Sequence, residues 1–286
     1  GRAMVRAARK YDRVFQTGSQ QRSTGPNRLG CEAVRGGRIG KIHTVIGADY
    51  PSPVDADLPA QPIPEGLDWD AWCGQTEPLP YNVERYEPHV KDGLGWMALR
   101  PYSGGGMTDW GAHGIDQVQW ALDTDDTGPV EVWIEGKGMK AKVRFRYAGG
   151  VVLKLDGGPG GGGIFIGDRG KITVGRNFFQ SEPAEIAQEA MKGTGWAELY
   201  KTPHLAIDTE NHLKNWVECI QSRRKPVADV EIGHRTCTVC HLGNIVRWVG
   251  RRLRWDPVKE IFPGDDEANA YLDRPKRKPY QLPDSV

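Results

Sequence analysis

Long hydrophobic runs are absent from the 286-residue sequence. No apolar segment approaches the roughly 18 residues that suggest a membrane-spanning helix, and no hydrophobic leader opens the chain. We therefore expect a globular protein of one large domain or two small ones, without a membrane partner. The compartment is not fixed by the sequence, since both a cytoplasmic and an exported protein fit; a signal peptide would lie upstream of Gly1.

An excess of charge is also lacking. The 38 Lys and Arg residues nearly balance the 37 Asp and Glu residues, which leaves a formal charge of +1. A general affinity for nucleic acid or for an anionic membrane surface is therefore not expected. The basic run at 274–278 is interpreted as solvated surface.

Cysteine is scarce, and its number, five, is odd, so no disulfide framework is expected. Cys237-Thr-Val-Cys240-His241 matches the C-x-x-C-H pattern of c-type haem attachment. It lies in a helical run, however, where the two cysteines share a face as small buried residues do. A second Cys/His pair for zinc is missing, so we predict neither haem nor a metal site.

Glycine, by contrast, is abundant, and its most informative run is 104–106, inside the stretch 103–120. Glycines let the backbone turn tightly and approach a ligand. Thr108 or Asp109 then supplies a helix cap, and apolar residues recur at helical spacing from Trp110 onward.

Asp109 and His113 lie four residues apart and so share one face at the start of this helix. Asp116 and Gln117 continue the row. An imidazole titrates near neutral pH and a neighbouring carboxylate favours its charged form, as proton transfer requires. The alternative is an N-cap aspartate and a structural histidine.

The run GGGMTDWGAHGID resembles the D-x-G-x-H signature of the Gfo/Idh/MocA oxidoreductases. The resemblance places Asp109 and His113 in an active site opposite the nicotinamide of bound NAD or NADP, as the catalytic residues. It also implies substrate contacts from their helix, at Trp110, Asp116 and Gln117.

Before this stretch, the pattern predicts a helix over 2–11, a short buried strand over 14–17, a polar loop over 18–23 and a helix over 26–35. Residues 1–24 then read as the tail of a dinucleotide-binding Rossmann domain, and 25–286 as a substrate and oligomerisation domain. The family resemblance implies cofactor contacts from Gln16, Gln20 and Arg22; the alternative is a solvated polar loop.

The Pro-rich segment 50–82 follows a predicted strand over 40–49 and carries Trp69, Trp72 and Tyr81. These aromatic side chains either form a small core of their own or stack on a sugar, and we include them as candidate substrate contacts. Trp96 and Arg100 loosely match an aromatic–basic pair that lies near the cofactor in family members.

Short β-rich runs separated by glycine turns follow the central helix, at 129–135, 141–147, 151–156, 164–167 and 171–174. Two helices come next: 212–222, expected to bury Leu213, Trp216, Val217 and Ile220, and 231–250. We predict an α/β (α+β) two-layer fold: a predominantly antiparallel open sheet of about six strands, with helices on one face. The open face is expected to pair two subunits in a homo-oligomer.

Gly158-Pro-Gly-Gly-Gly-Gly163 satisfies the G-x-G-x-x-G pattern, but a strand follows it, so it is predicted to be a turn. Gly1 itself falls inside a helical pattern without a cap. We therefore expect that the nucleotide fingerprint and the family's Glu-Lys-Pro motif precede Gly1, and that residues 1–286 alone are inactive.

The resemblance implies an NAD(P)-dependent oxidoreductase that transfers a hydride at a carbinol carbon of a sugar, cyclitol or related polyol. Two alternatives stay open. One is an NAD-dependent, glycoside-cleaving enzyme of the same family. The other is a non-catalytic sugar-binding or oligomerisation module.

Overall fold

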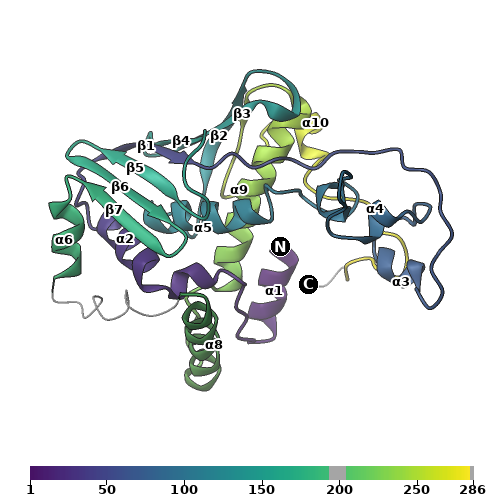
Figure 1. Ribbon diagram of the computed structural model, residues 1–286, viewed down its shortest axis with the longest axis horizontal. Helices are drawn as coiled ribbons and strands as arrows, with labels where there is room; N and C mark the ends of the chain where they lie inside the picture. Colours follow the sequence, from purple (N-terminus) through teal and green to yellow (C-terminus); the bar gives the residue numbers. More distant parts are fainter. Residues whose placement is uncertain (193–203, 284–286) are drawn as a thin grey trace.

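The computed structural model describes residues 1–192 and 204–283. Within them, eight strands form one open sheet in the order β7-β6-β5-β1-β4-β3-β2-β8 (Figure 1). All neighbouring strands run antiparallel except β1 and β4, which are parallel. The strands are β1 (Ile42–Gly47), β2 (Pro129–Glu135), β3 (Lys142–Tyr147), β4 (Val152–Leu155), β5 (Gly163–Gly167), β6 (Gly170–Gly175), β7 (Phe178–Glu182) and β8 (Leu253–Arg254).

Helices cover one face of this sheet. α2 (Gly25–Arg35) packs on β6 and β7, α5 (Trp110–Ala121) on β1 and β5, and α9 (Val230–Val249) on β2 and β3 (Figure 1). The remaining helices are α1 (Arg2–Lys10), α3 (Trp69–Cys73), α4 (Val83–Tyr86), α6 (Glu185–Met191), α8 (His204–Ser222) and α10 (Asp266–Asn269), with 3₁₀ turns at Gln20–Ser23, Trp96–Ala98 and Gly138–Lys140.

The main core lies between the sheet and these three helices. Alternate strand residues such as Val45, Leu153 and Phe165 are fully buried there, because side chains of a strand point to opposite faces in turn. Ile46 and Ile164, which pair across β1 and β5, belong to the other, open face and are only partly buried. The predicted two-layer, mainly antiparallel fold is confirmed.

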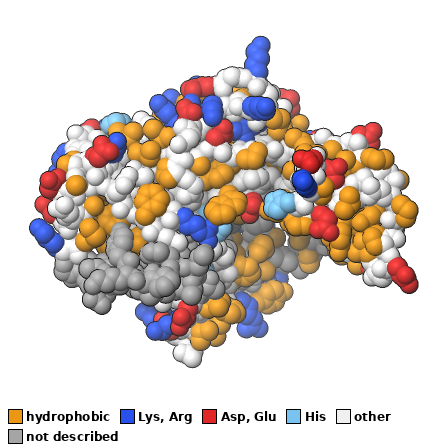
Figure 2. Space-filling model, viewed as in Figure 1, with side chains coloured by type: hydrophobic (Ala, Val, Ile, Leu, Met, Phe, Trp, Pro, Cys, Tyr) orange, Lys and Arg blue, Asp and Glu red, His pale blue; other side chains and the backbone are white. Residues whose placement is uncertain are grey.

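A separate lobe is formed by the segment that leaves β1 and carries α3 and α4 (Figure 1). Trp69 and Trp72 stack with 4.7 Å between ring centroids, and Tyr81 meets Trp69 edge-on at 5.2 Å. Figure 2 shows hydrophobic side chains gathered over this lobe. The long segment is therefore ordered by a small aromatic core of its own.

Two predicted details are wrong. Residues 14–17 join no sheet in the part of the chain that the structure describes: Gln16 forms an isolated bridge with Asp229, and Phe15 is 36% exposed. α8 exposes the apolar row that was expected to be buried, with Leu213 52% and Trp216 37% exposed. α8 projects from the body of the protein and buries a narrow stripe that includes His212 and Cys219 (Figure 1). Over the described residues, no helix is long and apolar enough to cross a membrane.

Candidate functional site

The glycine run forms the tight turn that delivers the chain to α5. Gly105 has φ +69°, and a Cβ there would lie 2.6 Å from the backbone nitrogen of Pro53, so only glycine fits without strain. One helical turn into α5, a Cβ on Gly114 would lie 2.5 Å from the Tyr50 hydroxyl. These glycines let the turn and α5 lie close against the segment that leaves β1.

Asp109 occupies the N-cap position of α5, but its side chain accepts no capping hydrogen bond. It lines a cavity of about 510 Å³ together with His113. The opposite walls come from the loop Thr17–Ser19 and from α9. No hydrogen bond joins Asp109 to His113 in the described part of the chain. The carboxylate and the imidazole are thus presented to one space, as their four-residue spacing predicts.

The surroundings of His113 favour its neutral form. Partial burial, and after it the positive charge of Arg176, lowers the pKa of this imidazole below 6.5, while Asp116 and Asp109 oppose the shift more weakly. The Trp110 ring packs edge-on against His113 at 6.1 Å between centroids, and the Arg176 guanidinium lies 5.2 Å from the centre of the same indole. A neutral imidazole at pH 7 is ready to accept a proton.

The wall contributed by α9 is the part of the site that the sequence did not reveal. His234, Cys237 and His241 all line the cavity. Their spacing, i, i+3 and i+7, places them on one helix face, and this is the signal that could have identified them. The expectation that Cys237 shares a buried face with Cys240 is wrong: Cys240 is fully buried, whereas Cys237 is exposed toward the cavity.

Arg22 and Asp116 form a buried ion pair instead of facing the cavity. The Arg22 Nε lies 2.9 Å from both carboxylate oxygens, and Asp125 holds the other end of the guanidinium at 2.7 and 2.8 Å. Thr236 of α9 also donates to Asp116, at 3.2 Å. The pair ties the 3₁₀ turn, α5 and α9 together. Contact of either residue with a ligand would require this pair to open.

The predicted glutamines have structural partners. Gln16 Nε2 donates to the His212 carbonyl at 2.8 Å, and Gln117 Oε1 accepts from Asn27 at 3.0 Å in the core. With its amide turned to donate to Gly18, Gln20 accepts from Arg176 at 3.3 Å. Gln20 and Gln117 each lie beside a residue that influences His113, since Gln117 Nε2 donates to Asp116 at 3.4 Å.

The aromatic candidates do not line the cavity. Trp69, Trp72 and Tyr81 form the core of the lobe, and the Trp69 indole donates to the Leu79 carbonyl at 2.9 Å. Trp110 is 52% exposed beside His113. None of these four side chains is among the residues that line the cavity with His113.

Trp96 and Arg100 are also remote from the cavity. Trp96 opens a 3₁₀ turn in the segment that leads to the glycine run. Arg100 pairs with Asp55 at 3.1 Å and stacks 4.6 Å from the centre of the Trp248 ring. The structure therefore does not bring this pair together with Asp109 and His113.

Two motifs take the forms that their context predicts. The glycine run Gly158–Gly163 leads into β5, not into a helix, so its amides do not form a helix N-terminus for a pyrophosphate. Cys237 to His241 lie within α9.

Among residues 1–192 and 204–283, no group of three or more His, Cys, Asp or Glu side chains is arranged to hold a metal ion.

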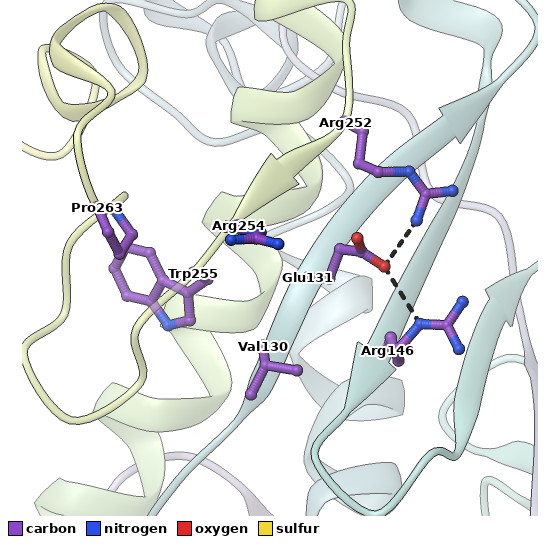
Figure 3. A pocket seen from close by; sticks show the side chains of 7 residues that line it. All are labelled: Val130, Glu131, Arg146, Arg252, Arg254, Trp255 and Pro263. Carbon is purple, nitrogen blue, oxygen red and sulfur yellow. Dashed lines mark hydrogen bonds and ion pairs between the residues drawn. The ribbon is translucent and has the colours of Figure 1, made fainter.

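A shallow pocket of about 570 Å³ lies elsewhere, at the edge formed by β2 and β8 (Figure 3). Glu131 of β2 accepts from Arg252 at 2.6 Å and from Arg146 of β3 at 3.1 Å. Desolvation is the largest single influence on this carboxyl group and raises its pKa. The two arginines together outweigh it, so the pKa of Glu131 is lowered. These ion pairs cross-link the edge strands, and no sequence-predicted site residue lines this pocket.

Fold and site together define an α/β domain with a carboxylate–imidazole pair at the start of a helix, where both face a cavity. The family described as "Oxidoreductase family, C-terminal alpha/beta domain" (GFO_IDH_MocA) matches residues 50–282. The chain therefore belongs to the Gfo/Idh/MocA oxidoreductase family.

Solved structures share this fold at low sequence identity. Aldose-aldose oxidoreductase from Caulobacter crescentus, complexed with glycerol, superposes with a TM-score of 0.52 at 14% identity, covering 88% of this chain and 67% of that one. The WlbA dehydrogenase from Bordetella pertussis, in complex with NADH and UDP-GlcNAcA, superposes with a TM-score of 0.53 at 14% identity. The match covers 88% of this chain and 68% of that one. An oxidoreductase domain protein from Kribbella flavida superposes with a TM-score of 0.55 at 14% identity. The match covers 87% of this chain and 67% of that one. No curated protein sequence matches significantly.

Proposed function

We propose that this chain provides the substrate-binding and acid–base part of an NAD(P)-dependent oxidoreductase that acts on a sugar, cyclitol or related polyol. The observation that carries the proposal is the shared orientation of Asp109 and His113 toward one cavity, with His113 neutral. Family membership supports it, and so does the UDP-GlcNAcA named with NADH for one of the structures with the same fold.

In this mechanism His113 accepts the hydroxyl proton of the substrate as the carbinol carbon is oxidised. Asp109, free of a capping role, binds a neighbouring hydroxyl or orients the imidazolium that forms. The cofactor, NAD or NADP, supplies the hydride acceptor. The proton thus stays on His113 while the electron pair leaves with the hydride.

The described residues fit only one end of such a cofactor. The loop Thr17–Ser19 and the start of α5 face the cavity and suit the nicotinamide end. A pyrophosphate needs a glycine turn that opens a helix, and the run that matches the G-x-G-x-x-G pattern, Gly158–Gly163, opens a strand. In this proposal, most of the nucleotide is therefore held by residues outside 1–286.

The test is product analysis with the complete protein, NAD or NADP, and a panel of sugars, cyclitols and their glycosides. Net formation of NADH or NADPH with an oxidised carbinol supports the proposal. Release of an aglycone without net NADH would indicate glycoside cleavage instead. Absence of both, with sugar binding retained, would indicate a non-catalytic module.

A further inference from the structure

A second cavity, of about 710 Å³, adjoins the one that contains His113. Both cavities are lined by Thr108, His234, Cys237 and His241. The second one continues along α9 to Trp248 and reaches the C-terminal segment at 271–276. Its volume is in the range of small-molecule sites, roughly 300–1,000 Å³.

Two buried polar atoms of residues that line this second cavity have no hydrogen-bond partner among residues 1–192 and 204–283. They are the Tyr102 hydroxyl and the Trp248 indole nitrogen, and both residues line the cavity. Nearly all buried polar groups in folded proteins are paired, so such groups indicate a missing partner. One indole donor and one hydroxyl that can donate or accept suit a molecule with several hydroxyl groups.

An exposed arginine, Arg274, is among the residues that line the same cavity. In the described part of the chain, Arg274 forms no ion pair and donates only to the carbonyls of Pro101 at 3.2 Å and Ser103 at 3.4 Å. Desolvation of its guanidinium, and after it the positive charge of Arg100, lowers the pKa of Arg274, and Asp55 opposes this shift more weakly. A bound anion would offset both effects.

We propose that this cavity is a second subsite, which binds a sugar unit that carries a carboxylate or a phosphate. Its hydroxyl groups bond to Tyr102 and Trp248, whose buried polar atoms turn toward the cavity on binding, and its anionic group bonds to Arg274. The inference rests on the proposed function, because it then makes the substrate a larger, acidic saccharide whose reacting ring lies beside His113.

The experiment follows the indole N–H of Trp248 by NMR in the 286-residue protein, with Trp248→Phe to assign the signal. Glucuronate, glucose 1-phosphate and glucose are titrated separately. We expect this signal to shift with glucuronate, with glucose 1-phosphate or with both. We expect glucose to bind at least tenfold more weakly. The first two arms distinguish a carboxylate from a phosphate.

Variants locate the contacts. Arg274→Gln should weaken binding of the anionic sugar by about tenfold or more, whereas Lys278→Gln, in the same basic run, should not. Arg274 also anchors the C-terminal segment through two carbonyls. Tyr102→Phe, which removes only the hydroxyl, should therefore weaken binding by about fivefold without that complication.

Equal binding of glucose and glucuronate, equal effects of the two cation variants, or no shift at any concentration would overturn the subsite. Failure of the proposed function looks different. His113→Ala should leave this binding unchanged, so binding without any turnover in the complete protein would refute the dehydrogenase and keep the subsite.

Discussion

Arg22 bonds through its Nε to both carboxylate oxygens of Asp116 at 2.9 Å, and the two side chains are 2% and 1% exposed. Trp120 lies 5.2 Å below the guanidinium, and Asp125 takes its outer nitrogens. Asp116 lies one turn beyond His113, so this pair fixes the helix that carries the proposed base. It positions the site but does not face the cavity.

Removing one charge of this pair should destabilise the protein strongly. Asp116→Asn is expected to lower the free energy of unfolding by about 3 kcal/mol, because the buried guanidinium then keeps only Asp125, which is 28% exposed, as its counter-ion. Denaturant unfolding measures the change. The control is Asp123→Asn, whose pair with Arg35 is exposed and should contribute less than about 1 kcal/mol. Equal effects of both variants would contradict the structural role given to Arg22 and Asp116.

Replacing the proposed base should impair turnover and leave ligand affinity nearly unchanged. In the complete protein, His113→Ala should lower kcat by roughly 10²–10⁴, the range for loss of a general acid–base residue. Asp109→Asn should lower it less if Asp109 only orients the imidazole. Steady-state kinetics with direct measurement of cofactor binding checks both. A wild-type kcat in His113→Ala would mean that the histidine is structural.

The titration of His113 should respond to its charged neighbours with opposite signs. NMR of the imidazole should give a pKa below 6.5, so kcat/KM is retained at pH 7 and falls as pH drops through that lower value. Arg176→Gln should raise this pKa, and Asp109→Asn should lower it. At a pH between the lowered pKa of folded His113 and its higher unfolded pKa, the unfolded state binds more protons than the folded state. His113 therefore lowers the free energy of unfolding as the pH falls through this window. A pKa that neither variant moves would refute the electrostatic account.

Local patterns were enough to predict α5 and the strands from β1 to β6. They failed where long-range packing decides. Nothing near Leu213 indicates that α8 projects from the body, because an apolar helical row looks the same whether or not a partner covers it. Asp116 and Arg22 were predicted to contact ligands, and the structure pairs them with each other. Their ion pair could not be read from local sequence, because the two residues lie 94 positions apart.

The open sheet face should mediate self-association. Ile46 and Ile164 pair at its centre and remain partly exposed. We expect Ile164→Asp to shift the molecular mass measured by light scattering to that of a monomer, because a buried unpaired charge opposes association. Gln188→Asp on α6 is the control, and Leu213→Asp tests whether α8 contributes instead. A monomeric wild-type protein, or a loss of association only in Leu213→Asp, would rule out the sheet face.

Residues 1–286 alone should bind neither NAD nor NADP at micromolar concentration. The pyrophosphate of a dinucleotide requires backbone amides of a glycine turn that opens a helix, and Gly158–Gly163 opens β5 instead. Only the nicotinamide end would meet the Thr17–Ser19 loop and α5, and that contact alone is too small for tight binding. Calorimetric titration with each nucleotide is the measurement. Micromolar binding would contradict the prediction. Gly160→Ala would then show whether the glycine turn is the binding site. The protein itself should tolerate this variant, since a Cβ at Gly160 meets no atom within 4 Å.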